Sequence, residues 1–423
     1  MTRIELREGG DPVEVPLDER SGLALRASGV VTATPAVASG WWTVGPTTKV
    51  GVARLGPVEV VVRPKVDIRR LMFLVGYARD GSFWREDDVT LDEHDDLLSA
   101  IAWAFTRQAE RATAQGLLQG YRVEETSSPV LRGRIRTTDQ VTRRYGQVLP
   151  LEVRYDEFDT DTAENQILRA ATHRLLRLEH LPPDVRPRLR RLARVFADVS
   201  PLPSGTAPPR WTRSRLNARY HVALGLGELV LRGSSVEQDA GLVRIDGFVL
   251  DMAKLFEDFL TQALGAALRF HGGACRAQDR WHLDEASSVL MKPDLVWYAS
   301  TSDRPTAVID AKYKAEKPSG YPNADLYQML AYCTVSGLPR GHLVYAKGNE
   351  SPGRHRVVRA GVEIHQHALD LDTEPGPLLE QVRALAAGIA SMSTSDHDPR
   401  MGPAGASLWE SWSRSSEMIN DPR

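Results

Sequence analysis

Asp294, Asp310 and Lys312 stand in two neighbouring apolar runs, "PDLVWYA" (293–299) and "TAVIDAKY" (306–313). Both runs are typical of strands, and "STSDRP" (300–305) between them predicts a hairpin connection. Side chains two apart on a strand share a face, so Asp310 and Lys312 are expected to project together. The hairpin brings Asp294 towards Asp310. Two carboxylates in one small volume favour a bound divalent cation, and Mg²⁺ prefers oxygen ligands. The alternative is a structural ion pair between Asp310 and Lys312 at the surface.

The flanking segments add further polar side chains to this pair of strands. Residues 248–268, "FVLDMAKLFEDFLTQALGAAL", have helical apolar spacing and predict an amphipathic helix with Glu257 at the margin of its buried face. Residues 323–337, "NADLYQMLAYCTVSG", predict a second helix, on which Gln328 and Tyr332 are four apart and share a face. Its Cys333 falls on the apolar stripe and is expected in the core. "GHLVYAKG" (341–348) predicts another strand.

This order of helix, strands and helix resembles the core of the PD-(D/E)XK nuclease superfamily. The resemblance implies that Asp294 and Asp310, with the Ala311 backbone carbonyl, bind Mg²⁺, for which Mn²⁺ can substitute. It implies further that Glu257 adds a ligand and that Lys312 positions or activates the attacking water. Gln328 and Tyr332 match a Gln-x-x-x-Tyr pattern found in one branch of that superfamily, as supporting positions.

The composition of the 423 residues is that of an ordinary globular protein, with 42% hydrophobic and 26% charged residues. Only two cysteines are present, which excludes a disulfide framework and a multi-cysteine zinc site. The charged N-terminal stretch is unlike a signal peptide, and no apolar run reaches membrane-spanning length. We therefore expect a cytoplasmic protein without a membrane partner.

Charge is unevenly distributed although the net charge is only −2. Residues 166–220 carry 12 Arg, no Lys and 3 acidic residues, whereas residues 79–96 carry 8 acidic residues and 2 Arg. A basic stretch of this kind suits DNA phosphates. The alternative is a set of solvated helix faces. The candidate DNA-binding residues are Arg186, Arg188, Arg190, Arg191, Arg194, Arg213 and Arg215.

The patterns along the chain predict an α/β protein of several domains. Residues 1–95 are β-rich, residues 96–240 are mainly helical and Arg-rich, and residues 241–390 form the PD-(D/E)XK-like domain. Residues 391–423 are polar and predict a disordered tail. The helix expected within 163–181 has Thr162 or Asp161 as its N-cap.

Four stretches outside the three catalytic candidates resemble successive landmarks of the McrC family, the nuclease subunit of the McrBC 5-methylcytosine restriction system. They are "VVVRPKVDIRRLMFLVGYA" (60–78), "QGLLQGYRVEETSSPVLRGRIR" (115–136), "YDEFDTDTAENQILRAA" (155–171) and "GFVLDMAKLFEDFL" (247–260). The resemblance runs from about residue 45 to about residue 350 in preserved order. It implies a Mg²⁺-dependent DNA endonuclease subunit that acts in phage defence with McrB, an AAA+ ring that hydrolyses GTP.

The resemblance also implies a division of labour, in which the N-terminal part docks on the McrB-like ring and stimulates its GTP hydrolysis. We assign this docking role to the β-rich residues 1–95. The sequence agrees in one respect, because no G-x-x-x-x-G-K-[ST] phosphate loop occurs in the chain. Two alternatives stay open. One is a stand-alone PD-(D/E)XK exonuclease or repair nuclease, and the other is a non-catalytic activator of a GTPase.

Overall fold

The computed structural model describes residues 2–79, 97–178, 181–203, 206–233, 246–299, 304–313, 323–346 and 353–394. The described residues form two compact units. The first contains the residues up to Met72 and those from 97 to Asp251; the second contains Phe73–79 and the residues from Met252 onwards. The acidic stretch from residue 80 to 96 and the predicted tail from residue 395 lie outside the described residues. The predicted domain boundaries stay a prediction.

The N-terminal part of the first unit contains two small sheets and the helix α1, in agreement with the β-rich pattern of the sequence. One sheet has the order β1 (Thr2–Arg7), β6 (Val58–Arg63), β5 (Lys49–Leu55) and β10 (Asp246–Asp251). The other has the order β2 (Val13–Pro16), β4 (Trp41–Pro46) and β3 (Val31–Pro35), and α1 (Glu19–Ser28) packs beside β3. Asp18 caps α1, because its carboxylate accepts a hydrogen bond of 2.7 Å from the backbone N–H of Ser21.

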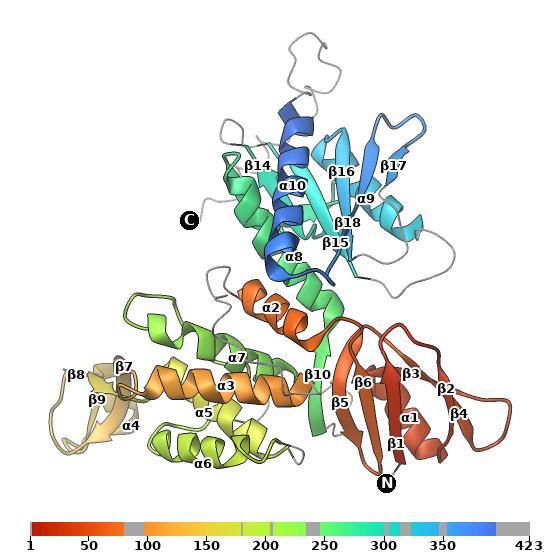
Figure 1. The fold of residues 1–423 in the computed structure, drawn as a ribbon. Helices are drawn as coiled ribbons and strands as arrows, with labels where there is room; N and C mark the ends of the chain where they lie inside the picture. Colours follow the sequence, from red (N-terminus) through yellow and green to blue (C-terminus); the bar gives the residue numbers. More distant parts are fainter. Residues whose placement is uncertain are drawn as a thin grey trace. The chain divides into compact units, whose positions relative to one another are not determined.

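Strand β10 corrects one expectation, because residues 248–251 were expected to begin a helix. They form instead the last strand of the first sheet, antiparallel to β5, and Figure 1 shows β10 beside β5. The two backbones approach closely at two glycines with positive φ: a Cβ on Gly51 would lie 2.2 Å from the oxygen of Phe248, and one on Gly247 would lie 2.1 Å from the oxygen of Val52. The helix begins one residue after the strand ends, as α8 (Met252–Arg269).

Helices make up most of the remaining first unit. They are α2 (Ile68–Arg79, which the unit boundary divides), α3 (Leu97–Thr113), α5 (Ala163–Leu176), α6 (Val185–Val195), the short helix Ala218–Tyr220 and α7 (His221–Gly233). The mainly helical pattern expected for residues 96–240 agrees with α3, α5, α6 and α7, and α5 is the helix expected within 163–181. Thr162 is the N-cap of α5, and its hydroxyl accepts a hydrogen bond of 3.4 Å from the N–H of Asn165.

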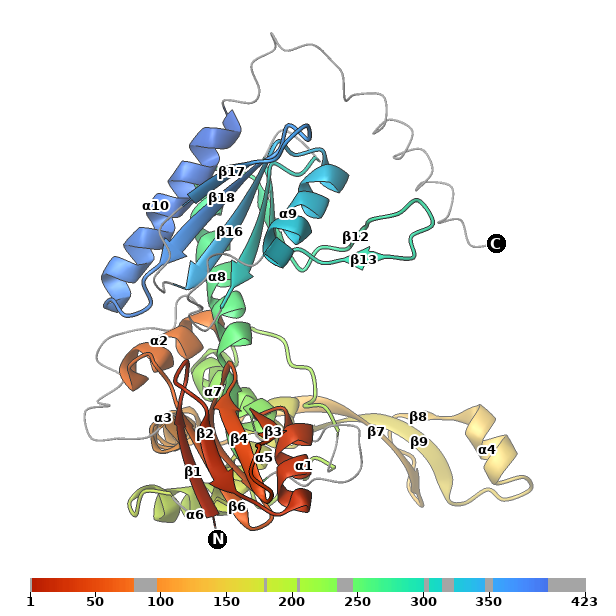
Figure 2. The same ribbon diagram turned by 90° about the vertical axis from the view of Figure 1, so that its right-hand side faces the viewer.

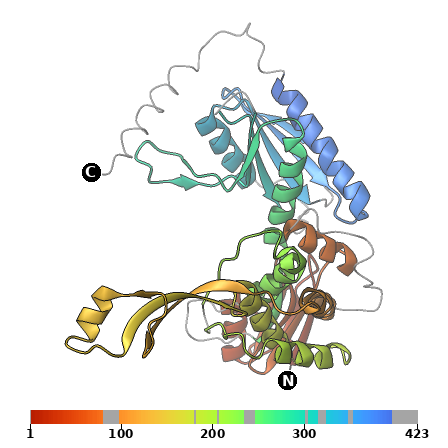
Figure 3. The same ribbon diagram turned by 90° about the vertical axis from the view of Figure 1, so that its left-hand side faces the viewer.

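A three-stranded sheet lies within the region that was expected to be mainly helical. It consists of β7 (Gly120–Ser128), β9 (Leu151–Asp159) and β8 (Arg134–Ile135), with α4 (Thr137–Arg143) between β8 and β9. Figure 2 and Figure 3 show residues 120–159 as a long arm, here called the β7–β9 arm. The arm has little core, since β7 has no fully buried residue. Its exposed apolar residues are Tyr121, Val123, Val130, Leu131, Ile135, Val141, Tyr145, Val148, Leu149 and Phe158.

The second unit is built on a six-stranded mixed sheet. Its order is β11 (Ala274–Ala277), β14 (Leu295–Tyr298), β15 (Ala307–Lys312), β16 (Arg340–Ala346), β18 (Glu363–Leu369) and β17 (Gly353–Arg356). Strands β14 and β15 are antiparallel, as predicted, and β15, β16 and β18 are parallel. In Figure 2, α9 (Asn323–Ser336) covers one face of the sheet and α10 (Pro375–Thr394) the other, on which α8 also packs. A hairpin of β12 (Trp281–His282) and β13 (Leu290–Met291) connects β11 to β14.

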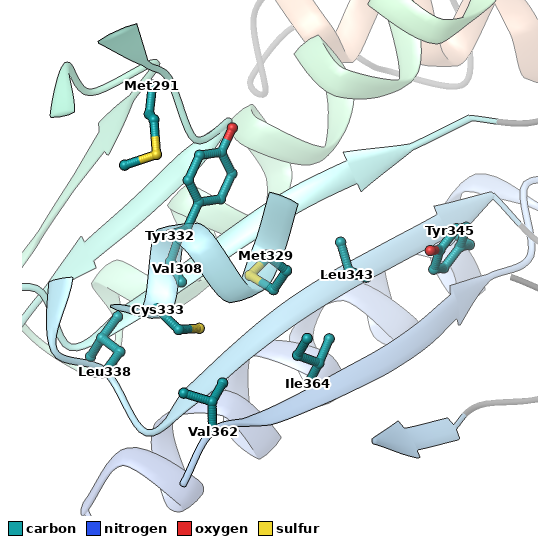
Figure 4. Packing of buried hydrophobic residues seen from close by; sticks show 10 residues of the cluster. All are labelled: Met291, Val308, Met329, Tyr332, Cys333, Leu338, Leu343, Tyr345, Val362 and Ile364. Carbon is teal, nitrogen blue, oxygen red and sulfur yellow. The ribbon is translucent and has the colours of Figure 1, made fainter. Parts of the chain in front are cut away.

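The core beneath α9 holds this helix on the sheet, as Figure 4 shows. Met329 and Cys333 of α9 lie against Leu343 of β16 and Ile364 of β18, and all four are almost fully buried. The core position predicted for Cys333 is therefore confirmed. Burial raises the pKa of its thiol to about 12, so Cys333 stays a neutral thiol at ordinary pH.

No helix within the described parts of the chain is long and apolar enough to cross a bilayer.

Candidate active site

Asp294 and Asp310 face each other where the β14–β15 ladder ends. The last antiparallel pair before them is Leu295 with Ile309, so continuing the register by one residue places Asp294 opposite Asp310. Side chains of directly opposed residues lie on one face of a sheet, about 5 Å apart at Cβ. Beyond this pair, the side chain of Asp294 bonds the neighbouring strand: its Oδ2 accepts a hydrogen bond of 2.8 Å from the backbone N–H of Ala311. The hairpin expected from the sequence thus brings the two carboxylates together.

Lys312 lies on the same face of β15 as Asp310, as the strand periodicity predicted. Its ammonium contacts Oδ2 of Asp310 as an ion pair. This pair is not a surface pair, because Asp310 is only 2% exposed and the Lys312 side chain is 16% exposed. The reading of Asp-x-Lys as a solvated ion pair is therefore wrong, although burial alone does not assign chemistry to the pair.

The electrostatics of the two carboxylates differ from those of ordinary surface acids. Burial, with the nearby charges of Asp310 and Glu257, raises the pKa of Asp294 to about 7. Burial also raises the pKa of Asp310, although the Lys312 ammonium acts in the opposite direction. Burial disfavours the ionised forms of both carboxylates, and for Asp294 the neighbouring acidic groups add to this effect. A cation bound between the two carboxylates would favour their ionised forms.

A chain of hydrogen bonds connects Lys312 to α9. Nζ of Lys312 donates to Oε1 of Gln328 at 2.8 Å, and Nε2 of Gln328 donates to the hydroxyl oxygen of Tyr332 at 2.8 Å. The Tyr332 hydroxyl donates to the backbone oxygen of Lys292 at 3.2 Å, two residues before Asp294. Burial raises the pKa of Tyr332 to about 12, so the hydroxyl stays a donor. Gln328 and Tyr332 thus lie beside the carboxylate–lysine group, as expected.

Glu257 reaches the site through a residue that the sequence did not single out. Oε1 of Glu257 accepts hydrogen bonds from Nζ of Lys254 at 2.6 Å and from Nε2 of Gln278 at 2.9 Å. Nε2 of Gln278 also donates to Oδ1 of Asp294 at 2.8 Å. Gln278 directly follows β11, in a region without any motif, so no sequence signal marked it.

The donor set suits a magnesium ion in its composition. Mg²⁺ is commonly held by one or two carboxylates together with water molecules, and the partly buried Asp294 and the buried Asp310 provide two such carboxylates. Across the described ranges, however, no three His, Cys, Asp or Glu side chains form a ready metal-binding group. Glu257 is therefore not part of a preformed ligand set, since its Oε1 is engaged by Lys254 and Gln278.

The candidate DNA-binding arginines lie in the first unit and have unequal surroundings. Arg188 pairs with Glu110, with 2.6 Å between Nη2 and Oε2, and this partner raises the pKa of the guanidinium. Arg186 donates to the backbone oxygens of Leu176 and Leu178, at 3.2 Å and 2.5 Å. These two arginines have structural partners. The exposed members of the set are Arg190, Arg191, Arg194, Arg213 and Arg215, whose DNA-binding role stays a prediction.

Comparisons with known proteins agree with the resemblance in the sequence. Residues 45–346 match the protein family described as "McrBC 5-methylcytosine restriction system component". No curated protein matches the chain.

Two solved structures from Thermococcus gammatolerans are similar to the chain. One is a refined half-complex from a tetradecameric assembly of McrB AAA+ hexamers with bound McrC; the match has 18% identity and a TM-score of 0.55, and covers 92% of this chain and 100% of that one. The other is a cryo-EM structure of the McrBC complex, with 19% identity, a TM-score of 0.41 and coverage of 63% of this chain and 88% of that one. The first likeness shows a shared fold, in agreement with the α/β class predicted from the sequence.

Proposed function

Since the chain belongs to the family of McrBC 5-methylcytosine restriction system components, we propose that it is the nuclease subunit of a restriction complex that cuts DNA containing modified cytosine. The proposed activity is that of a Mg²⁺-dependent endodeoxyribonuclease with a PD-(D/E)XK core in the second unit. The observation that supports it best is the pair of opposed carboxylates, the partly buried Asp294 and the buried Asp310, with Lys312 in contact with Asp310. A role in cutting incoming phage DNA places the chain in the cytoplasm.

Asp294, Asp310 and the Ala311 carbonyl would hold the cation, with Glu257 as a further ligand. A bound Mg²⁺ polarises a phosphate oxygen and makes a neighbouring water more acidic. The residues of the chain do the remaining work. Asp310 holds the Lys312 ammonium beside the reacting phosphate, where its positive charge stabilises the negative charge that develops in the transition state.

Gln328 and Tyr332 would orient the lysine. The carbonyl of Gln328 accepts from Lys312 while its amide donates to Tyr332, so the amide cannot turn over without breaking both bonds. Tyr332 is in turn fixed by the backbone of Lys292 and by its almost fully buried ring. The rotamer of Lys312 is thereby restricted, which reduces the entropy lost on reaching the transition state.

The proposed partner is a McrB-like AAA+ ring that hydrolyses GTP. The similar solved structure is of McrC bound to McrB hexamers, and this chain has no phosphate-binding loop of its own. The sequence predicted docking in residues 1–95; we propose instead a surface at residues 120–159 of the same first unit. Within that unit the β7–β9 arm offers the exposed apolar side chains that a partner would cover, among them Tyr145 at 88% and Val148 at 80% exposure.

Cleavage of methylated plasmid DNA tests this function. The purified chain, with Mg²⁺, GTP and a McrB-like AAA+ partner, is expected to cut plasmid that carries 5-methylcytosine and to leave unmethylated plasmid intact. Full digestion by the chain alone, from free DNA ends, would favour the stand-alone exonuclease. Stimulation of GTP hydrolysis without any DNA cleavage would favour the non-catalytic activator.

A further inference from the structure

Gln278 places its side-chain amide between two carboxylates of the candidate site. Nε2 lies 2.8 Å from Oδ1 of Asp294 and 2.9 Å from Oε1 of Glu257. These carboxylates come from different elements, since Glu257 belongs to α8 and Asp294 directly precedes β14. The amide nitrogen thus lies at a point where two acidic groups from separate parts of the unit converge.

The backbone of Gln278 has a conformation that side-chain-bearing residues rarely adopt. Its φ is +50°, in the left-handed region. The backbone is fixed at this residue, because its N–H donates to the oxygen of Asp294 at 3.2 Å, and Asp279 accepts a hydrogen bond from the Tyr298 hydroxyl. Such conformations persist where the surroundings impose them, and they gather at functional sites. Glycine or asparagine would adopt this backbone more easily, so the presence of glutamine indicates that the long amide side chain is used.

The position of the amide also fits an oxygen ligand. A half-turn about the last side-chain torsion exchanges the nitrogen and oxygen of a glutamine amide, whose two ends have almost the same shape. Oε1 would then lie 2.8 Å and 2.9 Å from the two carboxylate oxygens. Neighbouring oxygen ligands of an octahedral Mg²⁺ are about 3 Å apart, for metal–oxygen distances of about 2.1 Å. The distances from the end of the amide to the two carboxylate oxygens therefore match the distances between neighbouring oxygen ligands of Mg²⁺.

We propose that Gln278 is a metal ligand of this site. In the cation-free protein its Nε2 donates to Glu257 and Asp294 and offsets their mutual repulsion. When a divalent cation binds between these carboxylates, the amide turns and presents Oε1 to the cation. This inference rests on the metal site of the proposed function and adds to it a ligand that lies outside the PD-(D/E)XK pattern.

The proposal is tested by measuring the binding of Mn²⁺ alone to the full chain without DNA. Calorimetry and electron paramagnetic resonance give the affinity. Gln278→Met keeps the length of the side chain but removes the amide, and is expected to weaken Mn²⁺ binding at least about tenfold. Gln278→Glu keeps an oxygen at this position and is expected to bind at least as tightly as the wild type. The matched control is Gln262→Met on α8, the helix that carries Glu257, and its affinity is expected to be unchanged.

Gln278→Gly distinguishes an effect on metal binding from an effect on folding stability. It relieves the left-handed strain, so its thermal stability is expected to equal or exceed that of the wild type while its Mn²⁺ affinity falls as in Gln278→Met. Wild-type affinity in Gln278→Met, or weakened affinity in Gln278→Glu, would overturn the ligand role while leaving the proposed function intact. If Asp310→Asn binds Mn²⁺ as tightly as the wild type, the metal site of the proposed function fails.

Discussion

Nζ of Lys312 donates a hydrogen bond of 2.8 Å to the amide oxygen of Gln328, so a strand and the following helix together fix the direction of the lysine. The same ammonium contacts Asp310. Two acceptors from two elements determine where the positive charge lies. The proposed role of Lys312 depends on this placement. We therefore expect loss of Lys312 to slow DNA cleavage more than loss of its contact with Gln328.

Lys312→Ala is expected to lower the single-turnover rate of DNA cleavage by about 10²- to 10³-fold, the usual loss when one stabilising group is removed from a transition state. Gln328→Met keeps the charge but releases it from α9, so a smaller loss, of about tenfold, is expected. DNA binding by both variants, measured by fluorescence anisotropy in Ca²⁺, is expected to be unchanged. An unchanged single-turnover rate for Lys312→Ala would rule out the role of the lysine.

Asp310→Asn tests the buried carboxylate. The substitution is close to isosteric and removes a charge whose burial is costly, as its raised pKa indicates. The variant is expected to lose cleavage altogether while its thermal midpoint is no lower than that of the wild type. Nicking of supercoiled plasmid with Mg²⁺, together with a thermal melt, measures both properties. Full nicking activity would sink the assignment of Asp310 as a metal ligand.

A cluster of three histidines lies on the other face of the second unit's sheet. Leu343 and Ile364 belong to the core beneath α9, and strand residues alternate between faces. His342 of β16 and its register partner His365 of β18 therefore project to the opposite face, as does His367. Nδ1 of His342 lies 3.1 Å from Nε2 of His367.

The surroundings of this cluster keep the imidazoles neutral. Burial and the neighbouring histidines lower the pKa of His342 well below its ordinary value and that of His367 to about 4. Burial and the positive charge of Arg340 also lower the pKa of His365, although Glu363 acts in the opposite direction. The folded protein therefore binds protons less readily than the unfolded chain, whose histidines titrate near pH 6.5.

Acid is accordingly expected to destabilise the second unit. The full contribution of the histidines is present above about pH 6.5, and as the pH falls towards 4 the free energy of unfolding drops by up to about 1.4 kcal/mol per pH unit for each histidine that stays neutral. His367→Gln removes one such group, so its thermal midpoint is expected to fall less than that of the wild type between pH 7.5 and 5.5. His271→Gln, at an exposed position, is the matched control. Parallel pH profiles of His367→Gln and the wild type would contradict this account.

The sequence predicted that Asp294, Asp310 and Lys312 lie close together, because strand periodicity and a short hairpin determine which side chains meet, and both are local properties. Their roles in metal binding and catalysis stay predictions. Gln278 was missed because its position depends on a left-handed backbone and on contacts with α8, and neither leaves a pattern in the sequence.

The fold differs from the expectation based on the sequence in two segments, β10 and the β7–β9 arm, for related reasons. Strand β10 continues directly into α8, so the apolar residues 248–250 appeared to extend the helical pattern, and only the distant partner β5 makes them a strand. The β7–β9 arm was not recognised because β7, with the sequence GYRVEETSS, is mostly polar and has no fully buried residue. In both segments, pairing with a strand elsewhere in the chain determines the secondary structure.

The structure also changes how a docking role is best tested. Deleting residues 1–95 would remove β5, the strand that pairs with β10, and Phe73, whose ring packs 6.0 Å from that of Phe259 in α8. Loss of activity in such a deletion would not distinguish docking from damage to the fold. Substitutions on the β7–β9 arm avoid this difficulty, because they change side chains that are already exposed.

Tyr145→Ser combined with Val148→Ser removes two of the most exposed apolar side chains of the arm and leaves its strand pairing unchanged. Because their burial against a partner would contribute about 1.5–3 kcal/mol each, the double variant is expected to weaken binding to the AAA+ partner at least tenfold and to reduce stimulated GTP hydrolysis at limiting concentrations of the chain. Val358→Ser, a substitution at an exposed valine of the second unit, is the matched control and is expected to behave as the wild type. Equal stimulation by the arm variant and the wild type would place docking elsewhere in the first unit, and the exposed arginines Arg190, Arg191 and Arg194 of α6 would be the next surface to test.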